Sequence, residues 1–179
     1  MSDETIMDET IMIGESFVGE GANAAHINVV LGTRAALGTA WSTALATPRA
    51  GHIPFVTILR PNLPVKPLTL FVNKAPIDSD RHGTLTWGAA QAGVALGVVR
   101  AVEAGHINAA DADRLLLIAA VWVNPAADDD ASVYDHNTRA TEAALANAVR
   151  GLPSLDDVLT AADHPFNPFY DPGAATGRR

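Results

Sequence analysis

One stretch near the start of the chain organises the rest: Ile13-Gly14-Glu15-Ser16-Phe17-Val18-Gly19-Glu20-Gly21-Ala22-Asn23-Ala24-Ala25-His26-Ile27-Asn28. Three glycines, at positions 14, 19 and 21, interrupt it, and glycine permits turns and close backbone approach. The apolar run Val29-Val30-Leu31 follows and indicates a strand. Because side chains alternate along a strand, His26 and Asn28 are expected on the same face. This pair is a candidate site, in which His26 is either a functional acid or base or a structural histidine.

Length and composition narrow the class of protein. The chain has 179 residues, of which 48% are hydrophobic and 18% charged, which is typical of a single globular domain with its own core. The formal net charge of −8, without a basic cluster, argues against nucleic-acid binding. No uninterrupted apolar run approaches the roughly 20 residues of a membrane helix, and the acidic start is unlike a secretory signal. We therefore expect a cytoplasmic protein that binds no membrane.

The hydrophobic pattern predicts alternating strands and helices. Strands are expected over residues 24–31, 55–59, 68–74 and 115–123, with one more at 13–17, and helices over 36–45, 84–105 and 131–150. Strands 55–59 and 68–74 are expected to pair or to lie adjacent. The fold class that follows is a two-layer α+β domain with helices on one face of a mixed β-sheet. The other face would need cover, which favours self-association.

Three segments fall outside this pattern. Residues 1–12 repeat Asp-Glu-Thr-Ile-Met and indicate a flexible extension before a domain that spans residues 13–151. Residues 60–67 contain three prolines, which favours a stiff extended connection. Residues 152–179 form a Pro- and aromatic-rich tail, either disordered or packed as an extended arm on a neighbouring molecule.

Few residues have a pattern that indicates chemistry. The chain has no cysteine, and its six histidines form no His-x-x-x-His pair and have no carboxylate cluster at ligand spacing, so no metal site is expected. A phosphate-binding glycine loop and a Gly-x-Ser-x-Gly nucleophile elbow are both absent. Lys74, at the end of a predicted strand, is either a ligand contact or a surface charge. Gln91, on an apolar helix face, either satisfies a buried backbone group or contacts a ligand.

Several motifs resemble those of the formaldehyde-activating enzyme family. They are Gly14-Glu15 with Val18-Gly19-Glu20-Gly21, Ala25-His26-Ile27, Gly51-His52, Arg60-Pro61-Asn62-Leu63-Pro64-Val65-Lys66-Pro67, Gly88-Ala89-Ala90-Gln91-Ala92, and Asn137 with Ala140-Thr141. The resemblance runs from about residue 13 to residue 150. It implies a fold like the second domain of ribosomal protein S5 and a homopentamer with the site between subunits.

The resemblance also implies an activity and a set of site residues. The reaction is condensation of formaldehyde with tetrahydromethanopterin, a co-substrate, to 5,10-methylenetetrahydromethanopterin and water, without a metal. The family's proton donor matches His26, and its pterin-contacting positions match Asn28, Val56, Lys74 and Gln91. A histidine suits this chemistry, because an imidazole with a pKa near 6.5 can protonate the hydroxyl of a carbinolamine so that it leaves as water.

Two departures from the family pattern support an alternative function. Asn28 stands where the family has an aspartate, so an anionic acceptor is replaced by a neutral amide. Pro76 stands where the family has a threonine, so a hydroxyl and a backbone donor are lost. The alternative to the enzyme is a catalytically weak paralogue that binds or senses the pterin or formaldehyde.

Overall fold

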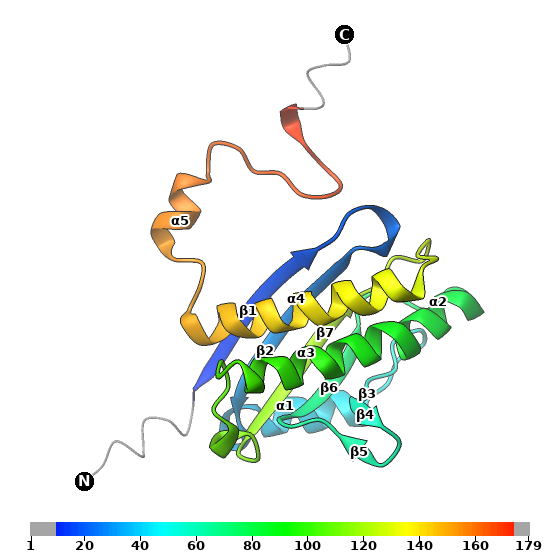
Figure 1. Ribbon diagram of the computed structural model, residues 1–179, viewed down its shortest axis with the longest axis vertical. Helices are drawn as coiled ribbons and strands as arrows, with labels where there is room; N and C mark the ends of the chain where they lie inside the picture. Colours follow the sequence, from blue (N-terminus) through cyan, green and yellow to red (C-terminus); the bar gives the residue numbers. More distant parts are fainter. Residues whose placement is uncertain (1–9, 174–179) are drawn as a thin grey trace.

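A five-stranded mixed sheet in the order β1-β2-β7-β6-β3 forms the centre of the protein (Figure 1). The computed structural model describes residues 10–173. The strands are β1 (Ile11–Val18), β2 (Ala25–Thr33), β7 (Leu115–Trp122), β6 (Leu68–Asn73) and β3 (Phe55–Val56). The β6–β7 pair is parallel, and the β1–β2, β2–β7 and β3–β6 pairs are antiparallel. The expected mixed sheet, and the expected pairing of the second and third predicted strands, are therefore confirmed.

The glycine-interrupted stretch is the β1–β2 hairpin. Gly19 has φ of +90° and Gly21 has φ of +64°, in the left-handed region that side chains with a Cβ rarely adopt. Gly14 lies inside β1, and a Cβ there would clash with the backbone of α4 (Asp130–Arg150) at Ala144 and Ala148. The glycines thus make the turn and let β1 lie directly against a helix.

Two helices lie side by side over one face of the sheet (Figure 1). One is α4, and the other is the continuous helix Asp80–Glu103, which comprises α2 (Asp80–Thr84), a π-helical segment (Leu85–Ala90) and α3 (Gln91–Glu103). Gly93 and Gly97 allow the close approach, because a Cβ at either would come within 2.5–2.6 Å of a carbonyl oxygen of α4. The two-layer α+β class is confirmed.

The Asp80–Glu103 helix differs from its predicted form in one respect. A regular helix over residues 84–105 would place Trp87 along roughly the same side as Gln91, Val94 and Val98. Trp87 is nevertheless 46% exposed, whereas the other three are buried. The π-helical segment adds a residue to the turn and rotates Trp87 away from the packed face. Within residues 10–173, this helix alone is long and apolar enough to cross a membrane. More than half of its most apolar 18-residue window is buried inside the domain.

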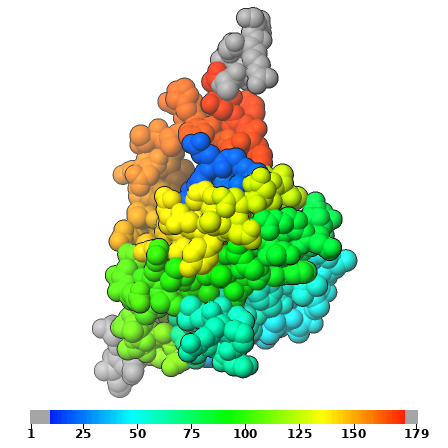
Figure 2. Space-filling view, turned by 45° about the vertical axis from the view of Figure 1, so that its right-hand side comes forward, coloured from blue at the N-terminus to red at the C-terminus, as the bar shows by residue number. Residues whose placement is uncertain are grey.

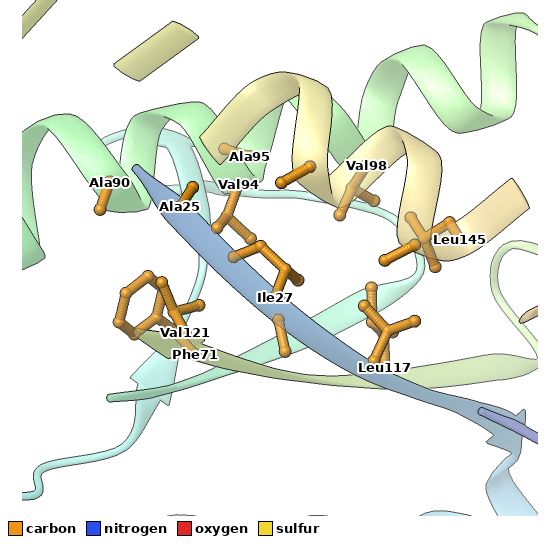
Figure 3. Packing of buried hydrophobic residues seen from close by; sticks show 14 of the residues in the cluster. Ala25, Ile27, Phe71, Ala90, Val94, Ala95, Val98, Leu117, Val121 and Leu145 are labelled. Atoms are coloured by element: carbon orange, nitrogen blue, oxygen red, sulfur yellow. The ribbon is translucent and has the colours of Figure 1, made fainter. Parts of the chain in front are cut away.

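Alternation along β2 separates the core from the candidate site. Ala25, Ile27, Val29 and Leu31 are at most 1% exposed and point toward the helices, where they pack with residues of β7, α3 and α4 (Figure 3). The intervening residues, including His26 and Asn28, therefore lie on the opposite face, so His26 and Asn28 share a face as predicted.

The opposite face is covered only in part by the chain itself. Helix α1 (Arg34–Ala46) lies behind the sheet in Figure 1, and the indole Nε1 of Trp41 donates a hydrogen bond to the carbonyl oxygen of Leu117 (3.1 Å). Toward the free edge, Ile11 and Ile13 of β1 remain 48% and 68% exposed. This strand begins at Ile11, two residues before the predicted start of the domain, and residues 1–9 lie outside the described residues.

Two segments predicted without regular structure contain short elements. Residues 60–67 were expected as an extended connection, but β4 (Ile58–Arg60) and β5 (Leu63–Pro64) pair there as a small hairpin, which turns at Asn62 with φ of +67°. Beyond Gly151, which ends α4 in the left-handed conformation, α5 (Leu155–Thr160) begins at a capping box between Ser154 and Asp157. The sequence shows this capping pattern, but the helix is too short to give a hydrophobic period.

Candidate functional site

His26 lies on the open face of the sheet with a carboxylate beside it. Its strand neighbours are Phe17 on β1 and Trp122 on β7. Glu15 precedes Phe17 by two residues on the same face, and its Oε1 lies 2.9 Å from Nε2 of His26. The backbone carbonyl of Glu15 accepts a hydrogen bond from Asn147 of α4, which holds β1 in place (3.1 Å). The hairpin register thus places a carboxylate beside the imidazole.

The environment of His26 favours its neutral form. Partial burial lowers the pKa of the imidazole, and the positive charge of Lys74 lowers it further. Glu15 acts in the opposite direction, through its charge and its hydrogen bond, and keeps this pKa from falling further. The side chain is 36% exposed, so solvent can still exchange protons with it.

Lys74 and Asn28 contact each other next to this pair. The ammonium Nζ of Lys74 donates a hydrogen bond to Oδ1 of Asn28. Lys74 directly follows β6, and its backbone N–H donates to the carbonyl oxygen of Val121 (2.8 Å), which fixes its position relative to β7. Burial lowers the pKa of Lys74, and Glu15 opposes this shift. Glu15, His26, Asn28 and Lys74 together are called the His26 cluster below.

Val56 and Gln91 lie outside the His26 cluster. The side-chain Oε1 of Gln91 accepts a hydrogen bond from the backbone N–H of Ile58 (2.7 Å), so in this chain the amide satisfies a partly buried backbone group. Val56, which precedes Ile58 by two residues, is half-buried on β3 and pairs with Leu70 of β6. Within residues 10–173, no hydrogen bond, ion pair or ring contact joins these two residues to the His26 cluster. The predicted site residues therefore form two groups on one chain.

Pro76 shapes the loop that follows Lys74. Gly51 has φ of +75°, and a Cβ there would come within 2.9 Å of the Pro76 ring. A residue with a side chain at position 51 would therefore clash with Pro76. Asn73, at the end of β6, donates hydrogen bonds to the carbonyl oxygens of both Gly51 and Ala75 (2.7 Å each). The position of Lys74 is thereby tied to a well-connected loop.

A cavity of about 810 Å³ opens beside His26. It is lined by Glu15, Phe17, Gly19, Glu20, Gly21, His26, Trp122, Phe166, Asn167, Pro168 and Phe169. Four aromatic rings and one imidazole therefore line this space together with the carboxylates of Glu15 and Glu20. In the part of the chain that the structure describes, no group of three or more His, Asp or Glu side chains is arranged to hold a metal ion.

Sequence reasoning missed Glu15, Trp122 and the tail residues as parts of the site. Glu15 was quoted only within a motif, although its spacing from Phe17 already put both on one face of a strand. Trp122 and the tail gave no such signal, because the β2–β7 register and the path of the tail bring them to His26. These contacts depend on chain segments far apart in sequence.

Comparison with known proteins agrees with the resemblance. Residues 13–170 match the model of the formaldehyde-activating enzyme family. A 5,6,7,8-tetrahydromethanopterin hydro-lyase of Methanosarcina barkeri is 38% identical over 159 residues, which cover 88% of this chain and 89% of that protein. A bifunctional enzyme Fae/Hps of Archaeoglobus fulgidus is 39% identical over 158 residues, and one of Methanococcoides burtonii is 38% identical over 154.

The chain belongs to the formaldehyde-activating enzyme family. It spans about 40% of the length of the two bifunctional relatives, but nearly the whole of the hydro-lyase. The family match extends through residue 170 and so includes most of the tail that lines the cavity.

Proposed function

We propose that this protein condenses formaldehyde with tetrahydromethanopterin to give 5,10-methylenetetrahydromethanopterin and water. The observation that carries the proposal is the Glu15–His26 pair at the wall of a cavity, in a chain of this family. The similar hydro-lyase, which carries the pterin in its name, supports the choice of co-substrate. The protein is a cytoplasmic lyase of one-carbon metabolism on this proposal.

The proposed reaction needs a proton donor at one step, the loss of water from the carbinolamine. A pterin amine adds to formaldehyde, its proton moves to the oxygen, and a carbinolamine results. His26 protonates the hydroxyl, the C–O bond breaks, and water leaves. The second pterin amine then attacks the same carbon and loses its proton, which restores the protonated imidazole. Because Glu15 contacts Nε2, the nitrogen that faces the substrate in this scheme is Nδ1.

The remaining site residues position the pterin. Lys74 and Asn28 lie beside His26, and in this proposal their polar groups hold the pterin so that both amines reach the formaldehyde carbon. Val56 and Gln91 make their own contacts apart from this cluster, Gln91 to the backbone of Ile58 and Val56 to β6. A site shared by two copies of the chain would bring both groups together, and the exposed Ile11 and Ile13 leave an apolar edge for such association. We accordingly propose a homo-oligomer, a pentamer, with the site between subunits.

The test compares the protein-catalysed rate with the spontaneous one. Purified protein is mixed with formaldehyde and tetrahydromethanopterin, and the product is followed by absorbance from about pH 5 to about pH 8, the range in which histidine titrates. Acceleration is expected across part of this range. No acceleration at any of these pH values would refute the enzyme for this pterin. The mass of the protein in solution tests the pentamer separately.

One observation favours a second function, a protein that binds or senses pterin or formaldehyde with little turnover. Residue 28 is a neutral amide held by Lys74, so the His26 cluster has one carboxylate, Glu15, and no second anion to keep the imidazole protonated. Saturable pterin binding without accelerated condensation would support this second function.

A further inference from the structure

The C-terminal arm, defined as residues 152–173, returns to the cavity beside His26. It leaves α4 at Gly151, passes through α5 and reaches the end of the β1–β2 hairpin (Figures 1 and 2). In Figure 2 the arm, coloured orange to red, stands against the blue hairpin. Sequence reasoning left this segment as either disordered or packed on a neighbour.

The tip of the arm is a closed turn. Asn167 and Tyr170 exchange two backbone hydrogen bonds of 2.9 and 3.1 Å, and Oδ1 of Asn167 accepts a third from the N–H of Phe169 (2.9 Å). Pro168 lies inside the turn, and its fixed φ reduces the number of backbone conformations that the turn can adopt. These local bonds give Phe169 a defined direction without help from the core.

The turn brings aromatic side chains to the cavity. The ring of Phe169 meets Trp122 edge to face, with centroids 5.6 Å apart and planes at 88°. Trp122 is the strand neighbour of His26, and Phe17 on the other side has its ring centroid 5.9 Å from that of His26. Phe166 of the arm lines the same space. Two aromatic rings from the sheet therefore face two from the arm.

The arm's rings are left uncovered by the chain itself. Phe166 and Phe169 are each 76% exposed, although burial of an aromatic side chain is favourable. A cavity of about 810 Å³ is within the usual size of a small-molecule site, about 300–1,000 Å³. Aromatic walls with a few polar groups suit a ring system that carries amines.

We propose that Phe166 and Phe169 of the arm form the outer wall of the binding site and hold the bicyclic ring system of the reduced pterin against Trp122. The identity of the ligand rests on the proposed function. In this arrangement the arm determines affinity and selectivity for the bicyclic ring, while His26 on the sheet supplies the proton. The arm then has a binding role and no part in proton transfer.

The experiment measures pterin affinity in full-length variants. Phe169→Ala and Phe166→Ala are compared with Tyr170→Ala, a matched control in the same turn that does not line the cavity. Affinity for tetrahydromethanopterin is measured by titration calorimetry, and KM and kcat are measured where turnover occurs. We expect Phe169→Ala to weaken binding about tenfold, the size of one aromatic pair, and to raise KM with little change in kcat. Tyr170→Ala should bind as the parent does, and Phe169→Tyr should retain affinity that Phe169→Leu loses.

The outcomes separate this inference from the proposed function. Turnover that is indifferent to both phenylalanine substitutions would overturn the arm's role and leave the enzyme standing. Binding that depends on Phe169 without any turnover would support the arm's role and refute the enzyme. An equal loss in Tyr170→Ala would overturn the proposal, because the arm would then act only as structure. A change in the protein's mass in solution without a change in pterin affinity would instead assign these rings to a second copy of the chain.

Discussion

Neighbouring residues of β2 belong to two different environments. Ile27 is fully buried under the helices, and its identity follows from packing. His26, one position earlier, faces a cavity, and its pKa depends on two charged neighbours, Glu15 and Lys74. The strand thus uses one face for stability and the other for chemistry. Substitutions on the two faces should therefore fail in different ways.

The largest expected effect follows from His26→Gln. Loss of a general acid reduces turnover by about 100- to 10,000-fold, while the free energy of unfolding should change little because the side chain packs no core. Turnover at saturating substrates and urea unfolding are the measurements. His164→Gln, in the exposed arm, is the matched control and should retain the parent's activity. If both variants were equally active, His26 would not be the proton donor.

The adjacent substitution, Ile27→Ala, should show the reverse pattern. Removing a fully buried isoleucine leaves a cavity and lowers the free energy of unfolding by about 2–5 kcal/mol. Activity per folded molecule should stay within a few-fold of the parent, because the side chain points away from the cavity. Urea unfolding and turnover at low temperature measure the two quantities. A selective loss of turnover without a loss of stability would show that the two faces are not independent.

Smaller effects are expected from substituting the charged residues around His26, and Glu15→Gln and Lys74→Met should shift its pKa in opposite directions. Glu15→Gln removes the group that raises the pKa of His26, so the protonated acid is lost at a lower pH and the falling limb of the kcat profile moves to lower pH. Lys74→Met removes a charge that lowers this pKa, so the limb moves to higher pH. Glu20→Gln, which lines the cavity without contacting His26, should leave the limb in place. NMR titration of the imidazole checks the same shifts without turnover, and shifts of the same sign would contradict the assignment.

The smallest effect is expected from Asn28→Asp. A carboxylate beside Lys74 and His26 favours the protonated imidazole, so the rate near neutral pH should rise, by up to about tenfold for each unit of pKa gained. The rate at pH 7 and the pH profile are compared with those of the parent. An unchanged rate would mean that residue 28 is not what distinguishes this chain from relatives with aspartate there.

Much of the fold could be predicted because it depends on local patterns. Apolar runs and helical periodicity located the main strands and helices, and the glycines at 14, 19 and 21 marked the hairpin before His26. Alternation along β2 also predicted that His26 and Asn28 share a face. The π-helical rotation at Trp87 was not predictable in this way, because it depends on how the helix packs.

The candidate site, like the fold, has features that the sequence predicts and features that depend on the tertiary structure. The sequence by itself determined the family, the histidine and the lysine, because motif residues are read without knowing where they meet. Only the tertiary structure decided that Glu15 contacts His26, that Lys74 contacts Asn28, and that Gln91 turns to the backbone of Ile58. It also decided that Phe169 of the arm meets Trp122, a residue far earlier in the chain. Such contacts arise from strand register and chain path, which no local pattern of residues encodes.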